Sequence, residues 1–179
     1  SRRFVIVRSG VRISLPAPYS SGAKQIEKTK MNNTLNILYA SMWGNAEDLA
    51  YELKEIAENK QYKVDINELD DISMNQLKEM KRVAVITSTT GHGDMPKNGE
   101  AFWESLSTTK DLDLSNVQYS VLALGDSSHE LFCNAGRQVD EQMVRLGARR
   151  ILDRTECDGD TTGFDEWSSK LLQSNTFQD

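Results

Sequence analysis

An alternation of apolar runs and helix-like segments from Thr34 onward is the strongest constraint on the fold. Five short runs are rich in apolar residues, and a segment with apolar residues at spacings of three and four follows each of them. Because strands joined through helices run parallel and are covered on both faces, the pattern predicts an α/β fold with a parallel sheet between two helical layers. The expected strands are 34–40, 62–67, 82–88, 118–125 and 149–153, and the expected helices are 45–59, 73–80, 98–106, 134–146 and 162–172.

The length and composition are those of one globular domain. The chain has 179 residues, 38% of them hydrophobic and only three of them proline, so it can bury a full core. It has no run of 18 apolar residues, which a transmembrane helix would need. Its two cysteines, Cys133 and Cys157, form no C-x-x-C pair, which favours a reducing compartment. We therefore expect a cytoplasmic protein.

The first thirty residues differ from the rest in charge and pattern. They hold seven of the 21 basic residues and one of the 27 acidic ones, and they show no sustained period. A mitochondrial transit peptide has such a composition. Alternatively, the segment lies upstream of a true start at Met31, since the codons GTTCGAATC for Val11-Arg12-Ile13 and GCACCA for Ala17-Pro18 resemble a transfer RNA gene. We expect residues 1–30 to be a disordered extension, possibly not native coding sequence, and residues 31–179 to form the domain.

The domain itself is strongly acidic. Residues 31–179 hold 14 basic and 26 acidic residues, a net charge of −12. Such a body repels nucleic acid and anionic membranes, and it attracts basic protein surfaces. We expect no nucleic-acid or membrane partner.

Polar, glycine-rich segments follow three of the expected strands, namely "SMWGNA", "STTGHGDMPKN" and "LGDSSHELFCN". The carboxyl ends of parallel strands meet at one edge of the sheet, where such folds bind ligands. In the first segment the strand turns directly into a helix, whose free N–H groups and dipole favour an anion. That turn has no lysine or arginine, so the anion would be held without a cationic side chain.

Other ligand motifs do not match. The chain has no G-x-x-x-x-G-K-[ST] run, no G-x-G-x-x-G run after the first strand, and no G-x-S-x-G nucleophile elbow. The segment "DGDTTGFDEWSS" begins like a calcium loop, but Ser169 stands where the closing glutamate belongs, so we expect an ordinary loop. His92, His129 and the two cysteines lack the spacing of a zinc site.

These segments resemble the flavodoxins, over essentially all of Thr34 to Leu172. "ASMWGNAEDLA" resembles the flavodoxin phosphate loop, and "ITSTTGHGDMPKN" and "ALGDSSHELFCN" are similar to the second and third loops of FMN domains in sulfite reductase and cytochrome P450 reductase. The length looks most like short MioC/YqcA-type flavodoxins. The resemblance implies a flavodoxin-like three-layer sandwich with a five-stranded parallel sheet in the order 2-1-3-4-5.

The resemblance also implies FMN as cofactor, with its phosphate on the first loop. Trp43 stands where the family has a threonine, and Thr90 and His129 stand where relatives commonly stack tyrosines on the flavin, so Phe132 would give only partial cover. Gly91 would carry a peptide that turns to hydrogen-bond the reduced ring, at little cost because glycine tolerates positive φ. The FMN-binding residues implied are Ser41, Met42, Trp43, Gly44, Asn45, Ala46, Ser88, Thr89, Thr90, Gly91, His92, Gly93, Leu124, Gly125, Asp126, His129, Phe132 and Cys133.

The function that the resemblance implies is electron transfer without a substrate of the chain's own. A monomeric carrier would take single electrons from an NADPH-dependent flavoprotein reductase and pass them to a terminal acceptor enzyme. It would meet the basic face of an NADPH–flavodoxin or ferredoxin reductase, or of a diflavin FAD domain. The alternatives are the FMN domain of a diflavin reductase and an interaction module without flavin.

Overall fold

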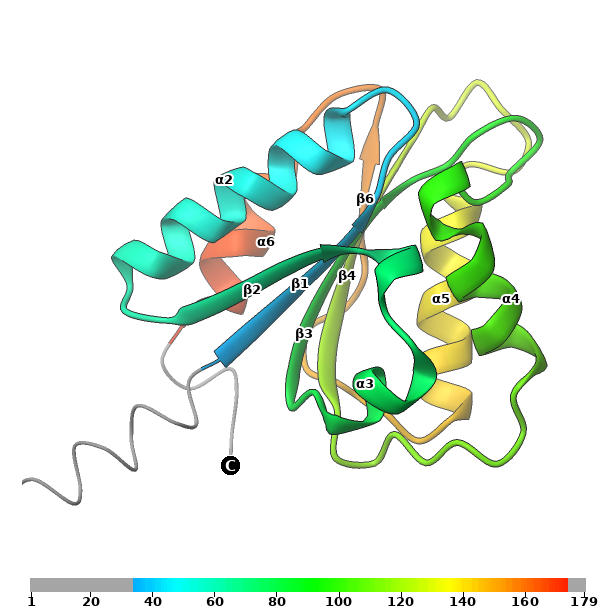
Figure 1. Ribbon diagram of the computed structural model, residues 1–179. Coiled ribbons are helices and arrows are strands. Elements are labelled where there is room, and N and C mark those ends of the chain that lie inside the picture. Colours follow the sequence, from blue (N-terminus) through cyan, green and yellow to red (C-terminus); the bar gives the residue numbers. More distant parts are fainter. Residues whose placement is uncertain (1–33, 174–179) are drawn as a thin grey trace, which may run out of the picture. The chain divides into compact units, whose positions relative to one another are not determined.

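The computed structural model describes residues 34–173, and the expectations for residues 1–30 lie outside this part of the chain. Within it, a single sheet of parallel strands has the order β2-β1-β3-β4-β5, and a further strand, β6, also pairs with β4 (Figure 1). This order confirms the predicted fold. The strands are β1 (Thr34–Ala40), β2 (Lys63–Glu68), β3 (Arg82–Ser88), β4 (Gln118–Gly125), β5 (Arg149–Arg150) and β6 (Thr155–Asp158).

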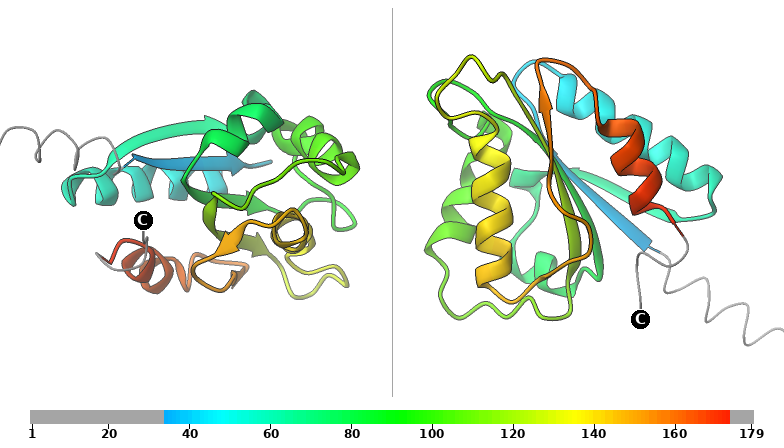
Figure 2. Two further views of the ribbon diagram at one scale, coloured as in Figure 1. Left: turned by 90° about the horizontal axis from the view of Figure 1, so that it is seen from below. Right: turned by 180° about the vertical axis from the view of Figure 1, so that it is seen from behind.

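Helices cover both faces of the sheet. Figure 2 shows α2 and α6 on one face and α4 and α5 on the other, and α3 packs on the α4 side. None of the helices in the described part of the chain is long and apolar enough to cross a membrane. The helices are α2 (Asn45–Asn59), α3 (Met74–Glu79), α4 (Glu100–Thr108), α5 (Asn134–Arg145) and α6 (Phe164–Leu171), with 3-10 turns η1 (Leu69–Asp71) and η2 (Lys97–Gly99).

Two apolar clusters join the layers, one on each face of the sheet. Alternate residues of β1 face opposite ways, so Ile37 packs with α2 and α6, whereas Leu38 packs with α4 and α5. On the second face α5 approaches the sheet very closely. A Cβ added to Gly136 of α5 would lie 2.4 Å from the Cβ of Ala123, so glycine is required there.

The fifth position of the sheet differs from the predicted strand 149–153. The first two residues of that range pair with the start of β4, but the chain then leaves the ladder and returns as β6, which pairs with the end of β4. In between, Arg150 and Arg154 both turn to the buried carboxylate of Asp140. Because of this detour, the strand that pairs with the end of β4 is β6, and it ends at Asp158.

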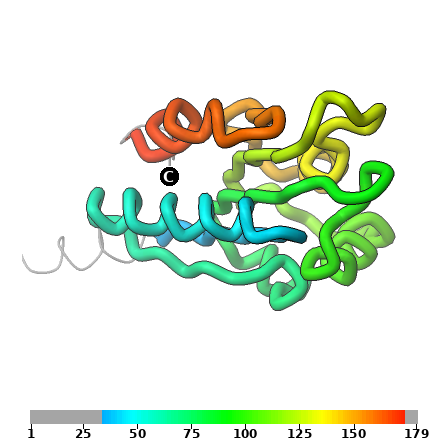
Figure 3. Tube along the Cα trace, turned by 90° about the horizontal axis from the view of Figure 1, so that it is seen from above, coloured from blue at the N-terminus to red at the C-terminus, as the bar shows by residue number. Residues whose placement is uncertain are grey.

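The loops that follow β1, β3, β4 and β6 project from one end of the sheet (Figures 1 and 3). They are called here the first, second, third and fourth loops, and they comprise residues 41–44, 89–99, 126–133 and 159–163. This end is where parallel-sheet proteins bind their ligands.

Candidate functional site

The four loops enclose a pocket of about 620 Å³, which is within the usual size for a small-molecule site. Fourteen of the eighteen residues that the sequence implicates in FMN binding line it: Met42, Trp43, Asn45, Ser88, Thr89, Thr90, Gly91, Gly93, Leu124, Gly125, Asp126, His129, Phe132 and Cys133. Leu131, Gly159, Asp160 and Thr161 also line it and were not predicted. Ser41, Gly44, Ala46 and His92 are not among the lining residues.

The first loop is held by its own serine. The Ser41 Oγ accepts hydrogen bonds from the N–H groups of Gly44 (3.0 Å) and Ala46 (3.2 Å). Gly44 has φ +97°, a left-handed conformation that suits glycine, and this bend turns β1 straight into α2. Two of the N–H groups expected to face an anion are thus already bonded to the serine, whose own O–H remains able to donate.

Three other N–H groups in this turn lack an acceptor. Within residues 34–173, no protein acceptor lies in hydrogen-bond reach of the N–H groups of Trp43, Asn45 and Glu47. The start of a helix normally leaves such donors, and its dipole adds partial positive charge. The turn therefore presents a cluster of N–H donors at the pocket, without a cationic side chain, and this arrangement suits a phosphate monoester.

The second loop closes on itself as a tight turn. Thr90 and Asp94 form an antiparallel bridge, with N–H to carbonyl distances of 2.9 and 2.8 Å. Between them Gly91 and Gly93 have φ +53° and +100°. His92 is exposed at the tip, and its N–H reaches an Asp94 carboxylate oxygen at 3.4 Å. Thr90, Gly91 and Gly93 of this turn line the pocket, whereas His92 does not.

The third loop ends in a strained residue. Cys133 has φ +52° and begins α5, and its buried thiol donates to the carbonyl of Ala123 at 3.3 Å. Burial raises the pKa of this thiol to about 12. A Cβ on Gly125 would lie 2.7 Å from the Cys133 nitrogen and 3.0 Å from the Phe132 ring, so the loop packs directly on the end of β4. Cys133 is a packing residue at the floor of the pocket.

The fourth loop joins the site because β6 extends the sheet. Asp158 accepts from the Ser127 N–H (2.7 Å) and Oγ (2.6 Å), and the Gly159 N–H donates to the Gly125 carbonyl (2.7 Å). These bonds tie the fourth loop to the third. The glycine and aspartates of "DGDTTG" were visible in the sequence, but the strand expected at 149–153 ended too early to bring them to this edge.

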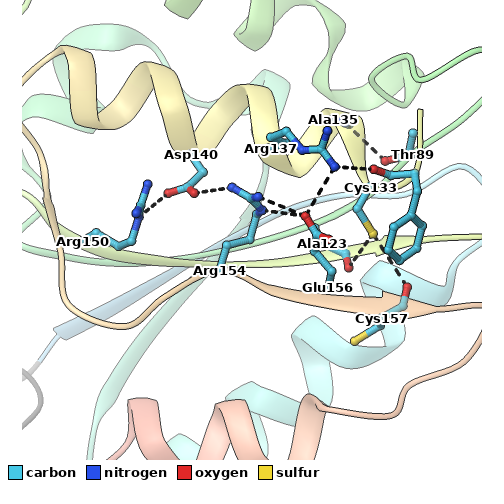
Figure 4. A network of polar contacts seen from close by, with 11 residues as sticks. Thr89, Ala123, Cys133, Ala135, Arg137, Asp140, Arg150, Arg154, Glu156 and Cys157 are labelled. Carbon is cyan, nitrogen blue, oxygen red and sulfur yellow. Dashed lines mark hydrogen bonds and ion pairs between the residues drawn. The ribbon is translucent and has the colours of Figure 1, made fainter. Parts of the chain in front are cut away.

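A network of charged groups supports the third loop from below (Figure 4). Asp140 of α5, which is only 1% exposed, accepts from the Tyr119 hydroxyl (2.8 Å) and from Arg150 (2.8 Å) and Arg154. The network continues to the third loop, because Arg154 contacts Glu156 at 3.0 Å, Glu156 contacts Arg137 at 3.7 Å, and Arg137 donates to the Phe132 carbonyl at 3.1 Å. No sequence pattern signals this network, since its members lie in segments that are distant in the chain, at residues 119, 132–140 and 150–156.

Exposed carboxylates surround the pocket. Asp94, Asp126, Glu130, Asp158 and Asp160 are all exposed, and Lys97 is the single lysine or arginine in the four loops. Hydrogen bonds from Ser128 lower the pKa of Asp126, and those from Thr162 lower that of Asp160, so both stay ionised at neutral pH. The pocket end is therefore negative.

The opposite end of the sheet carries charges of both signs. Exposed lysines and arginines lie where strands begin or helices end, among them Lys60, Lys78 and Arg145, and exposed carboxylates such as Glu58 and Glu79 lie beside them.

Comparison with known proteins identifies relatives of both the sequence and the fold. The sequence pattern of the family described as Flavodoxin matches residues 37–168. A flavodoxin from Streptococcus pneumoniae TIGR4 superposes with a TM-score of 0.66 at 26% identity, over 78% of this chain and 97% of the other. Flavodoxin 2 from Bacillus cereus gives 0.65 at 26% identity, over 78% and 92%.

Longer proteins contain a similar segment. The sulfite reductase [NADPH] flavoprotein alpha-component of Bacillus subtilis (strain 168) is 33% identical over 156 residues, which is 87% of this chain and 25% of that protein. The mitochondrial pyruvate dehydrogenase [NADP(+)] of Euglena gracilis is 38% identical over 141 residues, which is 75% of this chain and 8% of that protein. This chain therefore spans a quarter or less of these relatives.

Proposed function

The chain belongs to the flavodoxin family, and we propose that it binds FMN in the four-loop pocket and carries single electrons between protein partners. FMN supplies the one-electron chemistry when it is bound. The role of the chain is to bind the phosphate, to orient the ring and to limit the access of water. The observation that carries the proposal is the group of N–H donors at Trp43, Asn45 and Glu47, for which residues 34–173 provide no acceptor.

The donor set fits a monophosphate better than a larger phosphate group. Ser41 adds an O–H donor beside the three N–H groups, and its oxygen is held by the Gly44 and Ala46 N–H groups. A diphosphate or triphosphate would bring more negative charge to an end already surrounded by carboxylates. One phosphate at a dipole terminus needs no added cation, so FMN fits and a dinucleotide has no second phosphate site in the described loops.

The second and third loops would hold the ring. The Gly91 peptide lies in a turn whose left-handed φ costs a glycine little, and it would turn toward the ring when the flavin is reduced. The acidic rim of Asp94, Asp126 and Glu130 opposes the addition of negative charge, so we expect a low reduction potential.

The protein partners would bring basic surfaces to the pocket end. The carboxylates around the pocket match the basic face of an NADPH-dependent flavodoxin or ferredoxin reductase, or of a diflavin FAD domain, as electron donor. A terminal enzyme with a similar face would accept the electrons. Complementary charge predicts that association slows as salt rises, and rates independent of ionic strength in stopped-flow reduction would argue for apolar docking instead.

A direct test is the identity of the bound flavin. Purified protein, or apoprotein titrated with flavins, should be yellow with FMN, and denaturation should release FMN rather than FAD or riboflavin. A protein that stays colourless and takes up no FMN would end the proposal.

A second candidate is the FMN domain of a diflavin reductase, and the sulfite reductase relatives favour it. Reduction in trans separates the two. A free carrier should be reduced repeatedly by catalytic amounts of a separate NADPH-dependent reductase, with rates that saturate. A fused domain should react much faster when an FAD domain is covalently joined to it, because the link raises the effective concentration of its partner.

A further inference from the structure

Trp43 is unusually exposed for its size. It lies in the first loop, lines the pocket and is 88% exposed. Met42 and Leu131, which are 36% and 43% exposed, also line the pocket. A single exposed apolar residue is ordinary, but three large ones around one pocket mark a contact surface.

The backbone around Trp43 is fixed on both sides. The Ser41 N–H donates to Asn98 Oδ1 (3.0 Å), the Met42 N–H donates to Ser88 Oγ (3.3 Å), and the Gly44 N–H donates to Ser41 Oγ (3.0 Å). The indole can therefore change its position by rotating about its own side-chain bonds.

The other walls of the pocket offer little free aromatic surface. In the second loop, Thr90 stands where relatives commonly have a tyrosine, and its backbone is held in the bridge to Asp94. Phe132 is half-buried, its ring packs against Gly125, and its carbonyl accepts from Arg137. The imidazole of His129 also lines the pocket and is exposed, but the indole of Trp43 is the larger ring and is 88% exposed.

We propose that Trp43 covers the isoalloxazine ring of bound FMN and is a main determinant of flavin affinity. The inference rests on the proposed function, and it goes further because the first loop then binds the ring as well as the phosphate. An indole against a flat aromatic ring gains both buried apolar area and stacking. Trp43 stands where the family has a threonine, so the phosphate loses one hydroxyl donor. Contact between the indole and the flavin ring would compensate for that loss of affinity.

Two flavins and three variants test the inference. We expect Trp43→Ala to weaken FMN binding about tenfold or more, and Trp43→Phe to recover most of the loss, because a phenyl ring keeps part of the stacking. Riboflavin has the ring but no phosphate, so Trp43→Ala should weaken its binding by the same factor. Tyr51→Ala is the matched control, since Tyr51 is 48% exposed on α2 and does not line the pocket.

The indole itself provides a readout independent of affinity. Trp43→Phe identifies the Trp43 Nε1–H resonance among those of the three tryptophans, and FMN should shift it strongly. The Trp167 resonance should move little, because that indole is buried and donates to Ser120 Oγ at 2.8 Å.

Three results overturn the inference. The inference fails if Trp43→Ala binds FMN as tightly as wild type and if FMN does not shift the Trp43 resonance of the wild-type protein. The indole would then be free to contact a protein partner. A loss confined to FMN, with riboflavin unaffected, would mean that Trp43 acts only through the phosphate turn. If wild type binds no FMN under any condition, the proposed function itself fails, and this inference fails with it.

Discussion

Ser41 should affect both the stability of the chain and its affinity for FMN. Its Oγ accepts the N–H groups of Gly44 and Ala46, and Ala46 is fully buried. Ser41→Ala removes the single oxygen that accepts from both N–H groups and leaves the Ala46 N–H shielded from water. Loss of a helix-capping hydroxyl costs about 0.5–2 kcal/mol, and a shielded unpaired donor adds to this, so we expect the apoprotein to lose about 1–3 kcal/mol of unfolding free energy.

The effect on FMN should be larger than a general loss of stability can explain. The Ser41 O–H is free to donate to the phosphate, and a hydrogen bond to a charged group is worth about 1.5–3 kcal/mol. The dissociation constant for FMN should therefore rise about 10- to 150-fold. Riboflavin, which lacks the phosphate, should lose much less affinity.

Ser73→Ala is the matched control. Ser73 caps α3, where its Oγ accepts the Gln76 N–H at 3.3 Å in a reciprocal capping box, and it is exposed and does not line the pocket. Its loss should lower stability by about 1 kcal/mol and leave flavin binding unchanged. Urea unfolding of the apoproteins gives the first quantity, and quenching of flavin fluorescence on titration gives the second.

The reasoning about the phosphate site would be refuted if Ser41→Ala bound FMN as tightly as Ser73→Ala does. It would also be refuted if the two flavins lost affinity equally, since the serine would then act through the fold and not through the phosphate.

Three further predictions concern glycine and cysteine positions. Gly91→Ala should shift the one-electron reduction potentials of bound FMN by about 40 mV, since its Cβ would meet a carboxylate oxygen at 2.9 Å at φ +53° and cost about 1 kcal/mol; Gly147→Ala, which has φ +91°, no neighbouring atom closer than 3.7 Å and no place in the pocket wall, is the control in the same redox titration. Gly136→Ala should lower the free energy of unfolding, measured by urea denaturation, by about 1–3 kcal/mol, although alanine favours helices, because the new Cβ clashes with β4; an unchanged free energy would show that α5 can move away. Burial raises the thiol pKa of Cys133 to about 12 and of Cys157 to about 11, so native protein at pH 8 should resist iodoacetamide until it is unfolded. The contribution of these neutral thiols to stability is fully present below about pH 8.5 and should fall as the pH rises toward the two folded-state values. Rapid alkylation of native protein, detected by mass spectrometry, would contradict the burial.

The architecture and most of the pocket wall can be predicted from local patterns in the chain. The apolar strands 34–40, 82–88 and 118–125 were predicted with their observed bounds, because burial on both faces leaves a local signal in the sequence. Since parallel strands end at one edge, the three polar loops after them were correctly expected to lie together.

The position of the fourth loop and the hydrogen-bond partners in the turns depend on contacts between distant segments, which local patterns do not report. The detour between β5 and β6 depends on Asp140, Arg150 and Arg154, which meet only in the folded chain. The same holds for the Ser41 hydroxyl, which turns to two N–H groups, and for Trp43, which stays open. Periodicity reports which face of an element is buried, but the partner of a polar group is set by strand register and by residues distant in the chain.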